Sequence, residues 1–272
     1  MTDTTSANKA YFDKLAADYD SRFEKTIEQL VREIQRRKDL LGVDSAGDDD
    51  DSDDDDGPRT GRKQVKLLDY ACGTGLISRA LAQYTTQCTG IDISENMVAV
   101  YNTRAENQGL SEDEMRAYHG NLVDPADPAP AAFEGSRFRD FDVAGVGLGF
   151  HHLDDPEYAA RQLVARLRPG GVFFVVDFLP HAPVGGQGHR HGHGHGHGHG
   201  HEQGAGQEHE AADAIKHHGF SEERVRAIFE AAGAGQCFMF MELGSGVVFH
   251  GTRGEGGEPM KRRVFLARGT KA

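Results

Sequence analysis

Short apolar runs alternate with stretches of helical spacing along the central part of the chain. A short apolar run bounded by polar residues or glycines is typical of a buried strand. Strands are therefore expected at residues 65–68, 87–91, 115–119, 141–150 and 172–176. Between them the apolar residues recur at helical spacing, and this predicts helices that begin at about residues 76, 94 and 157. Alternating strands and helices indicate an α/β fold with a parallel sheet, in which right-handed crossovers bring the strand ends to one edge.

The two ends of the chain add helices and a final pair of strands. A short helix is expected at 8–20, followed by a longer one from 21 to 41 that Gly42 ends. Near the other end, Ser221 is expected to cap a helix. Two strands at 237–243 and 263–267 follow it and are expected to pair in antiparallel fashion.

A glycine-rich turn joins the first central strand to its helix. Cys72-Gly73-Thr74-Gly75 follows Asp69 at the strand end, and Ser78 stands where G-x-G-x-x-G would have its third glycine. Such a turn brings backbone close to a nucleotide-like ligand and aims a helix N-terminus at it. The next strand ends in Asp92, whose carboxylate can accept both hydroxyls of a ribose.

The run from Val65 to Ser78, together with Asp92, resembles motif I and the following acidic position of the class I S-adenosylmethionine-dependent methyltransferases. The run from Leu167 to Asp177 resembles the Leu-Lys-Pro-Gly-Gly segment before the fifth strand in that superfamily. The resemblance implies a Rossmann-like class I methyltransferase fold, with a seven-stranded, mostly parallel sheet and a C-terminal antiparallel hairpin. It also implies S-adenosyl-L-methionine as the cofactor.

The resemblance further implies which residues hold that cofactor. In the family an aspartate after the third strand usually contacts adenine; Asn121 takes its place, and an amide can both donate to and accept from a purine edge. Ala71 stands where many members have glycine, which leaves the turn slightly less room. The residues expected to bind the cofactor are Asp69, Ala71, Gly73, Gly75, Asp92, Ile93, Met97, Asn121, Leu122, Tyr11 and Tyr19.

The pattern around Tyr11 and Tyr19 resembles the N-terminal lid of many small-molecule methyltransferases; the alternative is an amphipathic helix that packs Tyr11, Phe12 and Leu15 into the core. The expected organisation is an N-terminal helical lid at 1–42, an acidic disordered linker at 43–64, and a methyltransferase domain at 65–272. A His/Gly-rich insertion is expected within that domain at 183–215.

The insertion contains a repeat in which histidine and glycine alternate. Glycine at every second position prevents a helix, and neutral imidazoles at this density bind divalent metals. A neutral expanded repeat, a metal buffer or sensor, and a pH- or metal-gated lid remain open as interpretations, and no metal centre is assigned. The candidate adventitious metal ligands are His191, His193, His195, His197, His199 and His201.

The charge and the cysteine content limit which classes of partner and which cellular compartments are expected. The formal net charge is −13, and residues 48–56 contain eight aspartates. Without a clustered basic face, nucleic acid is not an expected substrate. No segment approaches membrane-spanning length, so no membrane partner is expected. Three cysteines without a framework spacing favour a reducing compartment, the cytoplasm or nucleus. The oligomeric state is left open.

Two histidines follow the fourth strand at the edge where the predicted site lies. His151 or His152 could act as a general base near neutral pH. Alternatively, His151 packs beside the sulfonium while His152 caps the loop with Asp154 or Asp155. The motifs of nucleobase amine and cytosine methylation are missing after this strand, as is the carboxylate of the magnesium-dependent catechol type.

The sequence therefore predicts an enzyme, an S-adenosylmethionine-dependent methyltransferase that acts on a small-molecule substrate. The alternative is a non-catalytic cofactor-binding fold with a histidine-rich metal-handling loop. An NAD-dependent oxidoreductase is disfavoured by Ser78 and by the segment Pro169-Gly170-Gly171.

Overall fold

The computed structural model describes residues 3–43, 64–181, 215–244, 246–253 and 259–272. The acidic aspartate tract and the histidine repeat lie outside these residues, so the predictions for the linker and the insertion stay predictions. Across the described part of the chain, no helix is both long and apolar enough to span a bilayer.

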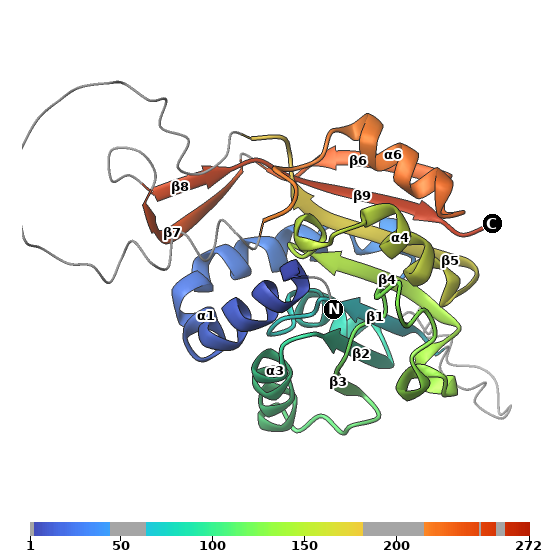
Figure 1. The fold of residues 1–272 in the computed structure, drawn as a ribbon, viewed down its shortest axis with the longest axis horizontal. Coiled ribbons are helices and arrows are strands. Elements are labelled where there is room, and N and C mark those ends of the chain that lie inside the picture. The colour runs from blue at the N-terminus through green and yellow to red at the C-terminus, as the bar shows by residue number, and fades with distance from the viewer. Residues whose placement is uncertain (1–2, 44–63, 182–214, 245, 254–258) are drawn as a thin grey trace, which may run out of the picture.

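The centre of the molecule is a seven-stranded sheet in the order β3-β2-β1-β4-β5-β9-β6 (Figure 1). The strands from β1 to β5 pair in parallel, whereas β9 runs antiparallel to both β5 and β6. This confirms the predicted mostly parallel sheet with an antiparallel C-terminal pair. The strands are β1 (Lys66–Tyr70), β2 (Gln87–Asp92), β3 (Met115–His119), β4 (Phe141–Gly147), β5 (Leu167–Phe178), β6 (Gln236–Glu242) and β9 (Val264–Thr270).

Helices cover both faces of this sheet. They are α1 (Asp3–Gln35), α2 (Leu76–Leu81), α3 (Glu95–Asn107), α4 (Pro156–Ala165) and α6 (Glu222–Ala231). Alternate strand residues point to opposite faces, and the core accordingly falls into two clusters. Leu67 belongs to the cluster that contains Leu30 of α1, whereas its neighbour Leu68 belongs to the cluster that contains Leu163 of α4 and Phe229 of α6. The helices α4 and α6 lie side by side (Figure 1).

The N-terminal region agrees in part with its prediction. α1 consists of two helical segments that meet at a kink, where Phe23 has non-helical backbone angles (φ −114°, ψ 15°), close to the break expected between 8–20 and 21–41, but the first segment begins earlier, at Asp3. α1 ends at Gln35 because the chain then tightens into the 3-10 turn η1 (Lys38–Leu41). Gly42 follows in the left-handed conformation and ends the segment, as predicted. After the kink the second segment packs Leu30 and Ile34 on the core, whereas the first segment contacts Thr74 and Ser94, which follow β1 and β2.

The strand predictions also need correction. β4 ends at Gly147 rather than at 150, because the chain turns into the 3-10 helix η6 (Phe150–His152). β5 begins at Leu167 rather than at 172, because the Arg168-Pro169-Gly170-Gly171 segment is held by backbone hydrogen bonds to Lys271. A hairpin of β7 (Val247–Arg253) and β8 (Pro259–Arg262), which the sequence did not predict, follows β6 and precedes β9 in the chain and forms a separate two-stranded sheet. The hairpin packs on α1, where Gln29 Nε2 donates to the carbonyl of Gly246 at 3.0 Å.

Candidate active site

The turn after β1 is built on left-handed backbone angles. Ala71, Gly73 and Gly75 have φ values of 51°, 50° and 97°. A Cβ on Gly75 would lie 3.0 Å from the ring of Tyr101, whereas a Cβ on Gly73 would meet nothing within 4 Å. Ala71 approaches the loop after β4 closely, since a Cβ on Gly149 would lie 2.8 Å from its own. The turn is therefore packed on both flanks and open above Gly73.

Asp69 faces into the protein rather than toward that open space. Its side chain is 1% exposed, and Oδ2 accepts hydrogen bonds from the N–H of Ser78 at 2.9 Å and from its hydroxyl at 2.8 Å. The hydroxyl of Tyr101 in turn donates to Ser78 Oγ at 2.7 Å. Burial raises the pKa of Asp69 to about 7, although the bonds from Ser78 oppose the shift. Asp69 thus fixes the start of α2, and Ser78 supplies this contact where the dinucleotide fingerprint has glycine.

Asp92 faces the turn. Its Oδ2 accepts from the N–H of Gly73 at 2.8 Å, and Oδ1 accepts from the N–H of Ser94 at 2.8 Å. Burial raises the pKa of Asp92, while those two bonds oppose the shift. The residue is 7% exposed. Met97, also predicted for the site, is buried in the first turn of α3, where Ser94 caps the helix.

The corner after β3 lies beside Asp92, because the N–H of Gly120 donates to the Asp92 carbonyl at 2.9 Å. Asn121 Oδ1 accepts from the hydroxyl of Tyr70 at 2.8 Å and from the N–H of Val123 at 2.9 Å. Both bonds use the amide oxygen of Asn121, so the amide nitrogen is the atom with which this side chain could bind a ligand. Leu122 is buried. Ile93 lies next to Asp92 in the chain, and its carbonyl is 3.2 Å from His119 Nε2.

Several polar contacts attach the N-terminal half of α1 to this edge of the sheet. Asp20 pairs with Arg104 and accepts from the hydroxyl of Thr74 in the glycine turn at 2.7 Å. Asp13 accepts from the hydroxyl of Ser94 at 2.6 Å. Near the helix start, Asn8 Nδ2 donates to the carbonyl of His152 at 3.1 Å. The sequence pattern contained these residues, but nothing in it assigned them a role.

Both tyrosines predicted for the lid lie on this half of α1. Burial, followed by the proximity of Tyr11 and Asp92, raises the pKa of Tyr19 to about 12. The N-terminal half of α1 packs against residues that follow β1 and β2. Its role as a lid over a bound cofactor stays a prediction.

His151 and Asp177 form a buried pair at the ends of β4 and β5. His151 Nδ1 lies 2.8 Å from Asp177 Oδ1, and the N–H of His151 donates to Asp177 Oδ2 at 3.0 Å. Burial opposes ionisation of Asp177, but the charge and hydrogen bonds of His151 and the N–H of Phe178 hold the pKa of the acid below its usual value. In the neutral form of His151, an ionised Asp177 would fix the ring proton on Nδ1 and leave Nε2 as an acceptor. The sequence placed Asp177 at its strand end without identifying this pairing.

His152 lies against the same pair. Its ring is 4.0 Å from that of His151 and 5.2 Å from that of Phe12 on α1. Asp155 caps α4 by accepting from the N–H of Tyr158 at 2.9 Å. Among the residues that the structure describes, no group of three or more His, Cys, Asp or Glu side chains could hold a metal ion.

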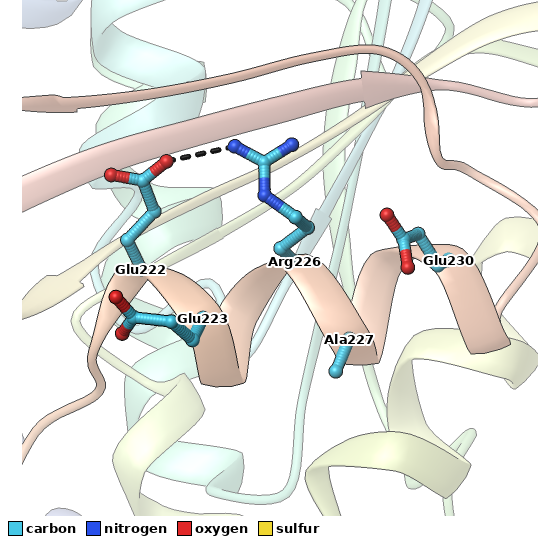
Figure 2. Close-up of a pocket in the computed structure, with 5 residues that line it drawn as sticks. All are labelled: Glu222, Glu223, Arg226, Ala227 and Glu230. Carbon is cyan, nitrogen blue, oxygen red and sulfur yellow. Dashed lines mark hydrogen bonds and ion pairs between the residues drawn. The ribbon is translucent and has the colours of Figure 1, made fainter.

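A separate hollow lies on the outer face of α6 (Figure 2). Its lining side chains are Glu222, Glu223, Arg226, Ala227 and Glu230, and Glu222 pairs with Arg226 at 2.8 Å. None of the residues predicted for the site lines this hollow, and a surface of solvated charges offers little apolar contact to a small molecule.

Comparisons with known proteins agree with this geometry. A family described as "Methyltransferase domain" matches residues 68–175. An uncharacterized methyltransferase of Schizosaccharomyces pombe is 28% identical over 196 residues, which are 66% of this chain and 66% of that protein. A demethylmenaquinone methyltransferase of Leptospira interrogans is 32% identical, over 41% of this chain and 42% of its own length. A ubiquinone biosynthesis O-methyltransferase of Idiomarina loihiensis is 32% identical, over 40% of each chain. The matches thus span less than half of these two bacterial relatives.

Solved structures extend the likeness in fold to nearly the whole chain. An S-adenosylmethionine-dependent methyltransferase of Clostridium acetobutylicum has a TM-score of 0.54 at 13% identity, covering 96% of this chain and 99% of its own. The methyltransferase in complex with the Trm112 activator of Haloferax volcanii also has a TM-score of 0.54, at 18% identity, covering 95% of this chain and 96% of its own.

Proposed function

We propose that the chain is a class I S-adenosylmethionine-dependent methyltransferase and that it transfers a methyl group from S-adenosylmethionine to a small molecule, a proposal supported by the match to the methyltransferase domain and by its methyltransferase relatives. The observation that carries the proposal is the pairing of the Asp92 carboxylate with the N–H of Gly73 beneath open space. A carboxylate there suits the sugar hydroxyls of an adenosyl group, and the missing Cβ of Gly73 leaves room for the ligand.

Other residues near the carboxyl ends of the parallel strands would also contact the cofactor. The amide nitrogen of Asn121 is the donor that remains for a purine nitrogen, because its oxygen is committed to Tyr70 and Val123. Tyr11 and Tyr19 would cover the ligand from α1. Asp69 would act indirectly, through Ser78 and the start of α2. When bound, S-adenosylmethionine supplies a methyl carbon that its positive sulfonium already activates.

The chain's own contribution to the reaction would be alignment of the acceptor and removal of a proton. His151 is the residue that would remove the proton, because its Nδ1 is bonded to Asp177 and its Nε2 points away from that carboxylate. The acceptor then gains a methyl group and loses one proton to Nε2, which passes it on to water. His152 and Phe12 would form an aromatic wall beside this histidine.

A small-molecule acceptor is supported by the acidic balance of the chain and by relatives that are named for quinone biosynthesis. The alternative, a binding module that handles metal through its histidine repeat, is supported by the repeat itself. Calorimetric titration with S-adenosylhomocysteine and with Zn²⁺ separates the two functions. Binding of Zn²⁺ alone would support the module and contradict methyl transfer.

A matched pair of glycine variants tests the cofactor site. Gly73 and Gly109 both have positive φ (50° and 73°), and a Cβ on either meets nothing within 4 Å. Alanine at each should cost about 1–2 kcal/mol of stability for the left-handed conformation. Only Gly73→Ala should also weaken S-adenosylhomocysteine binding, by about ten- to hundredfold, because its Cβ enters the space of the ligand. Equal affinities in G73A and G109A would refute the assignment.

A further inference from the structure

Asn8 on α1 holds a buried amide oxygen without a hydrogen-bond partner. The residue is 5% exposed, and its Nδ2 donates to the carbonyl of His152 at 3.1 Å. Its Oδ1 is out of contact with water and accepts no hydrogen bond within the part of the chain that the structure describes. The amide cannot simply be reversed, because the His152 carbonyl requires a donor. A buried acceptor without a donor is unfavourable, and one that persists points to a donor that a ligand brings.

The surroundings of Asn8 indicate which ligand that is. The carbonyl it contacts belongs to His152, whose ring stacks at 4.0 Å on the ring of His151. Phe12, one turn along α1 from Asn8, lies 5.2 Å from His152, and Phe178 lies 5.0 Å from His151. Asn8 therefore lies beside the proposed proton acceptor and among aromatic rings. The glycine turn and Asp92, which would hold the cofactor, are contacted by residues farther along α1.

The polar groups here favour a ligand that donates. With Nδ1 of His151 committed to Asp177, both Nε2 of His151 and Oδ1 of Asn8 are hydrogen-bond acceptors. Asp177 is ionised behind the histidine, and the carboxylate of Asp154 lies 3.5 Å from the hydroxyl of Thr5, one helical turn before Asn8. The nearby cation Lys216 is paired with Asp154 at 3.5 Å. An anionic acceptor such as a carboxylate or phosphate would therefore be repelled.

We propose that Asn8 binds the methyl acceptor, and that this acceptor is an uncharged aromatic compound whose hydroxyl groups donate to Asn8 Oδ1 and to His151 Nε2. The inference rests on the proposed function, since it assigns the acceptor side of the same site. One hydroxyl is the group that loses its proton to His151, and a second donor on the ring fills the vacant acceptor on Asn8. Methylation or removal of the second donor would leave Asn8 unpaired and weaken binding.

The test measures binding of catechol by ligand-observed NMR titration of the full chain saturated with S-adenosylhomocysteine. Catechol presents two hydroxyls, whereas 1,2-dimethoxybenzene has the same ring without donors and benzoate carries a charge. The wild-type chain should bind catechol at least about tenfold more tightly than either of the others. Asn8→Ala should weaken catechol binding about tenfold and leave the affinity for 1,2-dimethoxybenzene unchanged. Asn8→Leu, which keeps the volume, should behave in the same way and serves if the alanine variant fails to fold.

A control separates direct contact from loosening of the helix. Asn96 Nδ2 donates to the carbonyl of Asp13 at 2.9 Å, so it is an asparagine that joins α1 to the domain through the same kind of bond. Asn96→Ala should leave the preference for catechol intact. Equal losses in N8A and N96A, or catechol binding no tighter than that of its dimethyl ether, would overturn the inference.

Two further outcomes are informative. A loss of S-adenosylhomocysteine affinity in Asn8→Ala, with the catechol preference unchanged, would assign the oxygen to the cofactor instead and overturn the acceptor site. Failure of the wild-type chain to bind S-adenosylhomocysteine at all would contradict the proposed function itself. The two failures are therefore distinguishable.

Discussion

Replacing Asp69 by asparagine should remove a pH-dependent loss of stability. The folded-state pKa of this acid is about 7, against 3.8 as its ordinary value, because burial disfavours the charged form. Between these two values the folded chain holds a proton that the unfolded chain has released. Stability therefore falls as the pH rises from about 4 to about 7, the opposite of the usual behaviour of a carboxyl group. At 1.36 kcal/mol per pKa unit, the loss is at most about 4 kcal/mol.

Asparagine keeps an oxygen that can accept from both the N–H and the hydroxyl of Ser78, but it does not ionise. Urea unfolding of both proteins at pH 5 and pH 8 measures the effect. Asp69→Asn should gain stability relative to wild type between pH 5 and pH 8, by up to about 3 kcal/mol, because the remainder of the loss has already occurred below pH 5. A difference between the two proteins that is the same at both pH values would refute the raised pKa. A difference that moves in favour of the wild type at pH 8 would show that Asp69 is a stabilising anion.

Two further predictions concern the attachment of α1. Asp20→Ala removes the contacts to Thr74 and Arg104 and should weaken S-adenosylhomocysteine binding about fivefold, by calorimetry, whereas the exposed Asp18→Ala on the same helix should not. Ser94→Ala removes the cap of α3 and the bond to Asp13, and should lower the free energy of unfolding by about 0.5–2 kcal/mol. Unchanged affinity in D20A, or unchanged thermal unfolding in S94A, would contradict these roles.

Features with local causes were predictable from the sequence. Ser94 and Ser221 each cap the helix that follows because a hydroxyl bonds an N–H three residues later, and this requires nothing from the rest of the chain. The parallel strands were predictable for a related reason, since apolar runs separated by helices permit few arrangements. The family resemblance then supplied the antiparallel pair of β6 and β9.

Features that depend on contacts distant in the chain were not predictable in the same way. The directions that the two segments of α1 take on either side of Phe23 depend on what each segment packs against, and the β7–β8 hairpin is stabilised by its contact with α1. The pairing of His151 with Asp177 joins residues 26 positions apart, through the registry of β4 with β5. No periodicity or local motif encodes such a pairing.

The two acids of the site show most clearly why the structure is needed. Asp69 and Asp92 both stand at the end of a strand beside the same turn, and in the sequence either could contact a ligand. The structure separates them by the groups that each one faces. Asp69 is committed to Ser78 inside the protein, where it sets the direction of α2, while Asp92 accepts from the N–H of Gly73 at the edge of open space. Substitution of Asp69 should therefore change mainly the free energy of unfolding, whereas substitution of Gly73 should change mainly the affinity for the ligand.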